Sequence, residues 1–346
     1  MKKNNPFTLS FGELPKEYIS RYDLQDEVVS TFAAEHPVSR TYLIEGVRGS
    51  GKTVLMTKIS EEILSKGDWV VLNLNSTQDL LMDMSIRIAD LSRKITDPLA
   101  GGFNLSVAGF GVWLGGQQTD QHPISIIRDS LSELQKKKKK ILITIDEVEH
   151  NQSMRQFASE FQILIREGYS LFLIMTGLYD QIYAIQNDPA LTFLLRSSKI
   201  SLGPLNQGQM TNIYERAFET NRQTAKMLAE VTKGYAFAFQ ALGMLYYEYR
   251  DSLDMGEILI KLDEMLDGYV YGKIWDSLSD KDREVVLAFP EHTVKTKEMC
   301  EILSMESSIF SKYRDRLLKK GVIAAVRHGY IELALPRFKN VVEGYE

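Results

Sequence analysis

The amino-acid sequence predicts an α/β protein with a five-stranded parallel sheet, and three observations lead to that fold class. A glycine-rich loop at 46–53 stands between a short apolar run and an apolar-periodic helix. Short apolar runs then alternate with helical patterns up to residue 203, as they do when crossover helices join parallel strands. From residue 207 the patterns are helical, until a hairpin pattern near the C-terminus. We therefore predict an α/β core followed by smaller, largely helical domains.

Length and composition set broad limits. A chain of 346 residues exceeds the roughly 150 typical of one domain, and changes of pattern predict domains at 1–203, 204–273 and 274–346. The single cysteine, Cys300, excludes an internal disulfide framework and a cysteine-based zinc cluster. No apolar run approaches the roughly 20 residues of a membrane span, so we expect a cytoplasmic protein without a membrane anchor. The net charge of −5 argues against indiscriminate nucleic-acid binding but permits a local basic face.

The loop after the first predicted strand matches the phosphate-binding pattern G-x-x-x-x-G-K-[ST], which indicates a P-loop NTPase core. Its residues are Gly46, Val47, Arg48, Gly49, Ser50, Gly51, Lys52 and Thr53, and Val54 follows in the helix. Glycines let the backbone curl so that several N–H groups face one anion. These nine residues are therefore predicted to bind ATP or ADP, with Lys52 at the outer phosphates and the Thr53 hydroxyl on Mg²⁺. A turn without a ligand would have no use for lysine followed by threonine.

A second signal follows the buried run 141–145, which ends in Asp146 and Glu147. A strand that delivers adjacent carboxylates at its carboxyl end supplies two groups that a P-loop ATPase needs. We predict that Asp146 supports the Mg²⁺ ion and that Glu147 polarises the attacking water. The alternative is two acidic residues at an ordinary strand end.

Two further residues are candidates for the chemistry. Thr176 ends the run 170–175, where its hydroxyl could contact the γ-phosphate or orient water, or simply cap a helix. Arg196 precedes the fifth predicted strand, 199–202, and could neutralise transition-state charge in its own site or in a neighbour's. A surface salt bridge is the alternative for Arg196.

Two stretches outside the strands are candidate contact segments. Residues 7–36 contain Pro15 and Ile19, which could form an apolar clamp for adenine; the alternative is a helix that covers a sheet edge. Residues 99–116 carry several glycines among apolar residues, and alternation around Gly109 predicts a β-hairpin. The hairpin either folds back on its own domain or contacts a protein partner or neighbouring subunit.

The C-terminal patterns predict two helical domains. Helices fill 207–272, as in a small lid over a nucleotide. From residue 277 three helices and a hairpin predict a winged helix-turn-helix, with Ile309, Tyr313 and Leu317 on the buried face of the third helix. The opposite face of that helix presents Lys312, Arg316 and Lys319, a polarity that suits double-stranded DNA. A protein-docking module and a solvated helix face are the alternatives.

Five stretches together carry a family resemblance: Gly46–Thr53, Ile145-Asp146-Glu147, Met175-Thr176-Gly177, Gly203-Pro204-Leu205 and Thr232-Lys233-Gly234-Tyr235. They resemble the motif series of AAA+-type ATPases related to the archaeal ATPase and origin-recognition initiator families. The resemblance implies the order of ATPase core, lid and winged helix, and it adds Pro204 to the nucleotide-binding residues. Initiators usually carry a γ-phosphate-sensing arginine on a lid helix. The stretch 232–236 instead looks like that of signal-transducing switch ATPases, which favours slow turnover.

Three functions follow as hypotheses. The first is a slowly hydrolysing ATP-dependent switch that engages DNA through the winged helix. The second is a nucleotide-controlled protein-interaction switch that does not bind DNA. The third is phosphate transfer to a small molecule, which we disfavour because the sequence shows no obvious acceptor pocket.

Overall fold

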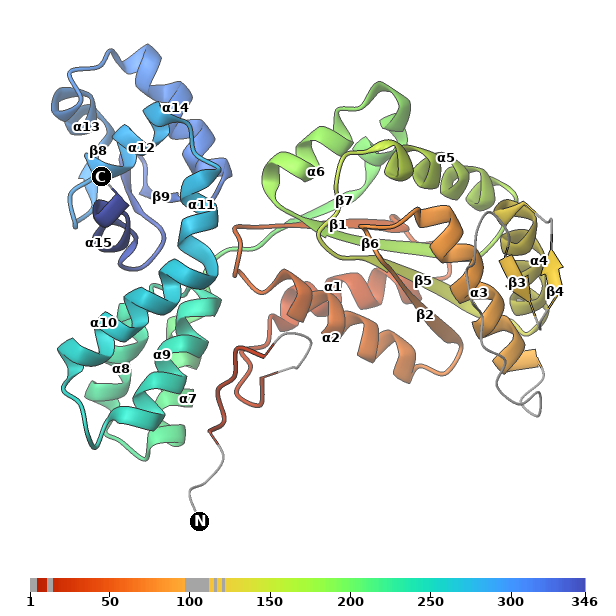
Figure 1. The fold of residues 1–346 in the computed structure, drawn as a ribbon, viewed down its shortest axis with the longest axis horizontal. Coiled ribbons are helices and arrows are strands. Elements are labelled where there is room, and N and C mark those ends of the chain that lie inside the picture. The colour runs from red at the N-terminus through yellow and green to blue at the C-terminus, as the bar shows by residue number, and fades with distance from the viewer. Residues whose placement is uncertain (1–4, 11–14, 97–111, 115–116, 120–121, 346) are drawn as a thin grey trace. The chain divides into compact units, whose positions relative to one another are not determined.

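The computed structural model describes residues 5–10, 15–96, 112–114, 117–119 and 122–345, and Figure 1 shows the fold. The chain forms two compact units, which we call the sheet unit and the helical unit. The sheet unit comprises Arg21–Glu45 and Lys52–Ser201, and the helical unit comprises Met1–Ser20, Gly46–Gly51 and Leu202–Glu346. The three-domain division at 203 and 273 groups the residues differently and stays a prediction.

The sheet unit contains the predicted five-stranded parallel sheet. Its strands are β1 (Thr41–Glu45), β2 (Trp69–Leu74), β5 (Lys140–Ile145), β6 (Leu171–Gly177) and β7 (Ser198–Ser201). Their spatial order is β2-β5-β6-β1-β7, and each neighbouring pair is parallel. Strand β6 therefore lies between β1, which leads into the P-loop sequence, and β5, which ends at Asp146. Sequence order alone would not have placed it there.

Helices cover both faces of this sheet (Figure 1). One face packs on α1 (Tyr22–Ala33) and α2 (Lys52–Ser65), and the other on α3 (Leu80–Thr96), α4 (Pro123–Lys136) and α5 (Gln152–Arg166). The Phe32 ring of α1 lies 5.5 Å from the Tyr42 ring and 4.9 Å from the Phe172 ring. Neighbouring strand residues Leu43 and Leu173 belong instead to the core that contains Phe157 of α5. Successive side chains of a strand point to opposite faces of the sheet, so the apolar residues of these buried strands pack against helices on both faces.

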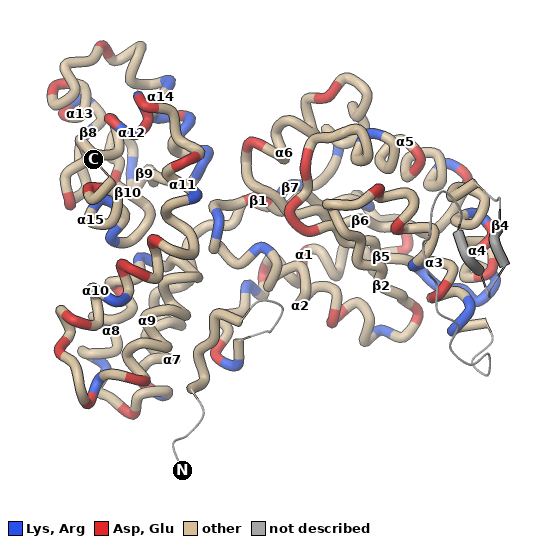
Figure 2. Tube along the Cα trace, viewed as in Figure 1, with Lys and Arg blue, Asp and Glu red and all other residues tan. Residues whose placement is uncertain are grey.

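Two segments of this unit have a distinctive amino-acid composition. The lysine run 136–140 lies at the connection between α4 and β5 (Figure 2). It leads into the first residue of β5, whereas Asp146 follows the last residue of the same strand. Strands β3 (Val112–Leu114) and β4 (Gln117–Thr119) pair in antiparallel fashion, so this hairpin begins near the end of the predicted segment 99–116 and extends beyond it. The predicted turn near Gly109 lies outside the described residues.

The helical unit begins with a set of packed helices. They are α7 (Gln207–Phe218), α8 (Arg222–Val231), α9 (Ala236–Tyr249) and α10 (Met255–Leu266), continued by a π-helix (Asp267–Tyr271) and α11 (Gly272–Asp276). Phe7 from the N-terminal segment is 2% exposed and packs in this core against Tyr214, Phe218 and Phe239. No helix in the described parts of the chain is long and apolar enough to cross a membrane.

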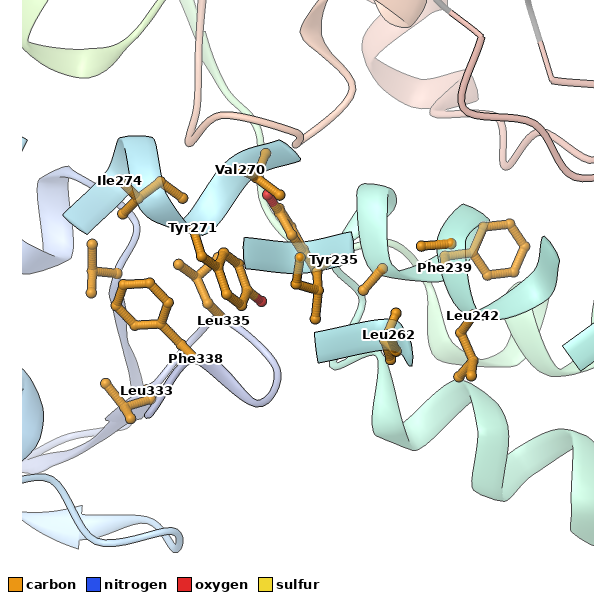
Figure 3. Packing of buried hydrophobic residues seen from close by; sticks show 14 of the residues in the cluster. Tyr235, Phe239, Leu242, Leu262, Val270, Tyr271, Ile274, Leu333, Leu335 and Phe338 are labelled. Atoms are coloured by element: carbon orange, nitrogen blue, oxygen red, sulfur yellow. The ribbon is translucent and has the colours of Figure 1, made fainter. Parts of the chain in front are cut away.

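The C-terminal part has the element order predicted for a winged helix. The helices are α12 (Asp280–Leu287), α13 (Thr296–Ile302) and α14 (Ser307–Lys319), followed by α15 (Phe338–Val342) and a 3-10 turn (Glu343–Tyr345). A three-stranded sheet has the order β8 (Val294–Lys295), β10 (Tyr330–Leu333), β9 (Ile323–Arg327). Its apolar residues join the core of the helices before it, and Figure 3 shows Phe338 and Leu335 beside Tyr271.

One detail of the third helix was predicted wrongly. Ile309 was expected on the buried face of α14, but it is 43% exposed. Phe310 and Leu317 are both fully buried instead. The larger apolar ring of Phe310 fills the core one position further along, which rotates the buried stripe of the helix.

Candidate functional site

The candidate site in the sheet unit centres on the Asp146 carboxylate, directly after β5. Thr53, the second residue of α2, donates from Oγ1 to Asp146 Oδ2 at 2.7 Å. Thr176 of β6 donates from Oγ1 to the other carboxylate oxygen, Oδ1. Two hydroxyl groups that are far apart in the sequence thus meet on one carboxylate. Parallel strands end at the same edge of a sheet, which is why these residues meet.

Glu147 takes a left-handed backbone conformation, with φ of 49°. This conformation is strained for a residue with a side chain, so neighbouring contacts must hold it. The Glu147 N–H donates to Thr176 Oγ1 at 3.2 Å, and the next amide, Val148 N–H, donates to the Thr176 carbonyl at 2.8 Å. Thr176 is fully buried, whereas Glu147 is exposed. The buried threonine therefore fixes the backbone while the glutamate side chain remains accessible.

The donor set fits Mg²⁺. Magnesium binds oxygen ligands at about 2.0–2.1 Å in octahedral geometry, which places neighbouring ligands roughly 2.9 Å apart. The Thr53 hydroxyl and the Asp146 carboxylate oxygen are 2.7 Å apart, close to that spacing. Among the described residues no group of three or more His, Cys, Asp or Glu is placed to hold a metal ion. An ion here would take its remaining ligands from phosphate and water, as Mg²⁺ commonly does.

The glycine-rich part of the loop, Gly46–Gly51, belongs to the helical unit. It forms a tight turn in which Ser50 N–H donates to the Val47 carbonyl at 3.2 Å. Gly49 and Gly51 have φ of 76° and 91°, in the region that glycine adopts without strain. Lys52, the first residue of α2, is 8% exposed. The turn thus has the curled backbone that phosphate binding requires.

Other predicted residues lie in one unit or the other. Ile19 is 6% exposed within the helical-unit core, and Pro204 packs against Gly234 in the same unit. Pro15 is half-buried. Arg196 ends a 3-10 helix, Pro189–Arg196, and is exposed. Within the described residues no hydrogen bond or ion pair joins Arg196 to Asp146, so its role stays a prediction.

The three cations proposed for DNA differ in their surroundings. Lys312 and Lys319 are exposed on α14. Arg316 instead donates from Nε at 3.0 Å and from Nη2 at 2.6 Å to Oδ1 of Asp282, a residue of α12 that is 1% exposed. The Arg316 guanidinium therefore joins two helices within the unit, a pair that the periodicity of either helix does not indicate.

A second cluster escaped the sequence analysis. Asp188 is 6% exposed, lies 2.8 Å from His150 Nε2, and accepts from Arg155 Nε at 2.5 Å and from the Ala190 amide at 2.9 Å. The hydrogen bonds from His150, the Ala190 amide and Arg155 hold the pKa of Asp188 well below its usual range. The cluster ties the loop after β5 to the 3-10 helix that ends at Arg196. No local pattern marks a contact between residues so far apart in the chain.

Comparisons with known proteins agree with the fold. A family model described as a domain of unknown function (DUF8462) matches residues 268–342. No curated protein matches the sequence. The chain is similar to the solved structure of the ORC2 protein of Aeropyrum pernix in its ADPNP–ADP complexes, with a TM-score of 0.60 and 14% identity, covering 97% of this chain and 96% of that chain.

Two further structures from the same organism are similar. The ADP form of ORC2 has a TM-score of 0.55 at 14% identity, with 97% of each chain covered. The ORC1 protein in complex with DNA has a TM-score of 0.49 at 14% identity, covering 95% of this chain and 93% of that chain. The two ORC2 likenesses bear out the predicted resemblance at the level of the fold, because the chain has the fold of these ORC2 structures.

Proposed function

We propose that this protein is a nucleotide-controlled switch that binds ATP with Mg²⁺, hydrolyses it slowly and engages double-stranded DNA through its C-terminal helices. The observation that supports nucleotide hydrolysis best is the convergence of the Thr53 and Thr176 hydroxyls on the Asp146 carboxylate, next to an exposed Glu147. The similar ORC2 structures are complexes with ADPNP and ADP, which supports the choice of an adenine nucleotide.

Each residue then has a defined task. The curled turn 46–51 would receive the phosphates on its backbone N–H groups, and Lys52 would neutralise the outer phosphates. Thr53 and Asp146 would hold Mg²⁺, which when bound offsets the charge on the phosphate oxygens. Thr176 would hold the Glu147 backbone, and Glu147 would accept the proton of the attacking water. Pro15, Ile19 and Pro204 are proposed to contact the base, and Arg196 to act as an arginine finger.

Replacing Glu147 by Gln tests the hydrolytic assignment. The amide cannot accept the proton of water, so we expect turnover to fall by about 10²–10⁴-fold while ATP stays bound. Release of ADP and phosphate from purified protein measures turnover, and this product analysis also separates hydrolysis from phosphate transfer to a small molecule. Glu149→Gln is the matched control, because it removes the same charge from an exposed residue of the same loop. Equal turnover in wild type and Glu147→Gln would refute the assignment.

The second candidate function is a protein-interaction switch without DNA. The exposed apolar side chains of Ile302 and Ile309, which are 48% and 43% exposed on α13 and α14, favour it. So does the ion pair that engages Arg316 within the unit.

Titration of duplex DNA at two salt concentrations separates the two candidates. Phosphate contacts release counterions, so DNA binding should weaken as salt rises. The double variant Lys312→Glu/Lys319→Glu, with Arg316 retained, should lose this binding if α14 contacts DNA. Wild-type protein that does not bind duplex DNA even at low salt would leave the protein-interaction switch as the better proposal.

A further inference from the structure

The start of α9 contacts the backbone of the P-loop turn at two successive carbonyl groups. Tyr235, which caps α9, donates from its hydroxyl to the Arg48 carbonyl at 2.5 Å. Phe237, in the first turn of α9, donates from its backbone N–H to the Gly49 carbonyl at 3.1 Å. All of these residues belong to the helical unit. One helix start therefore holds two carbonyls of the turn.

Holding a carbonyl also sets the direction of the next N–H group. A trans peptide is planar, so the Arg48 carbonyl and the Gly49 N–H lie in one rigid plane and point in opposite directions. A donor that fixes the Arg48 carbonyl therefore directs the Gly49 N–H away from Tyr235. The Gly49 carbonyl and the Ser50 N–H are related in the same way, and Ser50 N–H turns back to Val47. Phosphate-binding turns work through the directions of these N–H groups.

The Tyr235 side chain is buried, and its hydroxyl stays protonated and can donate a hydrogen bond. Its side chain is 5% exposed, and burial raises the pKa of its phenol, an effect that nearby Arg48 only partly offsets. A Cβ at Gly49 would collide with the Tyr235 hydroxyl, so the tyrosine requires glycine at that position.

Tyr235 is also connected to the C-terminal helices by packing contacts through Tyr271. Its ring stacks on the Tyr271 ring, with centroids 6.1 Å apart and planes inclined by 23° (Figure 3). The Tyr271 hydroxyl donates to the Pro336 carbonyl at 2.6 Å, and its ring meets the Phe338 ring edge-on at 4.8 Å. Val47 of the turn also lies close to the end of α14, since a Cβ at Gly321 would be 3.3 Å from Val47 Cβ.

We propose that Tyr235 is a positioning residue that fixes the P-loop backbone in the phosphate-binding conformation and links that conformation to the C-terminal helices through Tyr271. This inference rests on the proposed nucleotide binding. By thermodynamic linkage, nucleotide that orders the turn should also stabilise the contacts of Tyr235.

Tyr235→Phe tests the proposal, because it removes one hydroxyl and keeps the ring. The Arg48 carbonyl then loses the hydrogen bond from Tyr235, and we expect ATP and ADP to bind about 10-fold more weakly, which corresponds to about 1.4 kcal/mol. Titration with a fluorescent adenine nucleotide measures this change. Amide hydrogen exchange of residues 46–51 without nucleotide should also become faster in the variant.

Tyr214→Phe is the matched control. Tyr214 is fully buried in the same unit, and its hydroxyl donates to the Phe239 carbonyl at 2.6 Å, so the same atom is removed from the same kind of contact away from the turn. We expect its nucleotide affinity and its exchange at 46–51 to match wild type. If Tyr235→Phe also matches wild type in both measurements, the positioning role is refuted. If wild-type protein itself does not bind adenine nucleotide, the proposed function is refuted, while exchange at 46–51 still tests the hydrogen bond.

Discussion

Arg316→Gln should destabilise the C-terminal helices, because it breaks an ion pair whose acidic partner is buried. Asp282 is 1% exposed, and its Oδ1 accepts both bonds from Arg316 while its Oδ2 accepts from Ser279 Oγ at 2.7 Å. The substitution leaves one oxygen of the carboxylate without these donors. Removing one partner of a fully buried ion pair costs about 3–5 kcal/mol. The Arg316 side chain is 42% exposed, so water can reach the site, and we expect about 1–3 kcal/mol.

A cost of that size should lower the melting temperature of a unit of this length by about 2–12 °C. Because the protein has two compact units, hydrogen exchange of peptides from α12 and α14 reports the effect better than one global transition. Arg314→Gln is the matched control, since Arg314 lies on the same helix and pairs with its neighbour Asp315, whose side chain is 55% exposed. If α12 and α14 exchange equally fast in both variants, the Asp282 pair does not join these helices.

Two further predictions concern the sheet unit. Thr176→Val keeps the shape of the side chain but removes the hydroxyl between Asp146 and the Glu147 amide, so ATP turnover should fall on the order of 10–100-fold, with ATP affinity within about 3-fold of wild type. Thr176→Ser should restore most of the turnover, and a fully active valine variant would contradict this role. Asp188→Asn should reduce the loss of folding stability at low pH. The folded-state pKa of Asp188 lies below the unfolded value of about 3.9, so the stabilising contribution of the carboxylate is complete above about pH 5. That contribution is lost as pH falls through about 3.9 towards the folded-state pKa. Urea midpoints of both proteins from pH 7 to pH 3 measure the difference, and parallel curves would show that the cluster around Asp188 does not contribute.

The sequence determined the parts of this protein that depend on local pattern. The P-loop residues 46–53 follow a fixed spacing, and the run before Asp146 is apolar except for Thr144, so strand, turn and helix could be assigned from neighbours in the chain. The predicted buried run 141–145 lies within β5 (Lys140–Ile145) for the same reason. The order of apolar and polar residues along a single strand or helix is a property of a short stretch of the chain.

Only the tertiary structure decided which distant residues meet. It placed β6 between β1 and β5, which brings the Thr176 hydroxyl to Asp146. It also paired Arg316 with Asp282 and set the Tyr235 hydroxyl on the Arg48 carbonyl. Periodicity predicts which face of an element is buried, but the partner across that face depends on how whole elements pack. Hydrogen bonds between residues far apart in the chain form only after that packing is fixed, and the acceptor of Tyr235 is a backbone carbonyl, which every residue has.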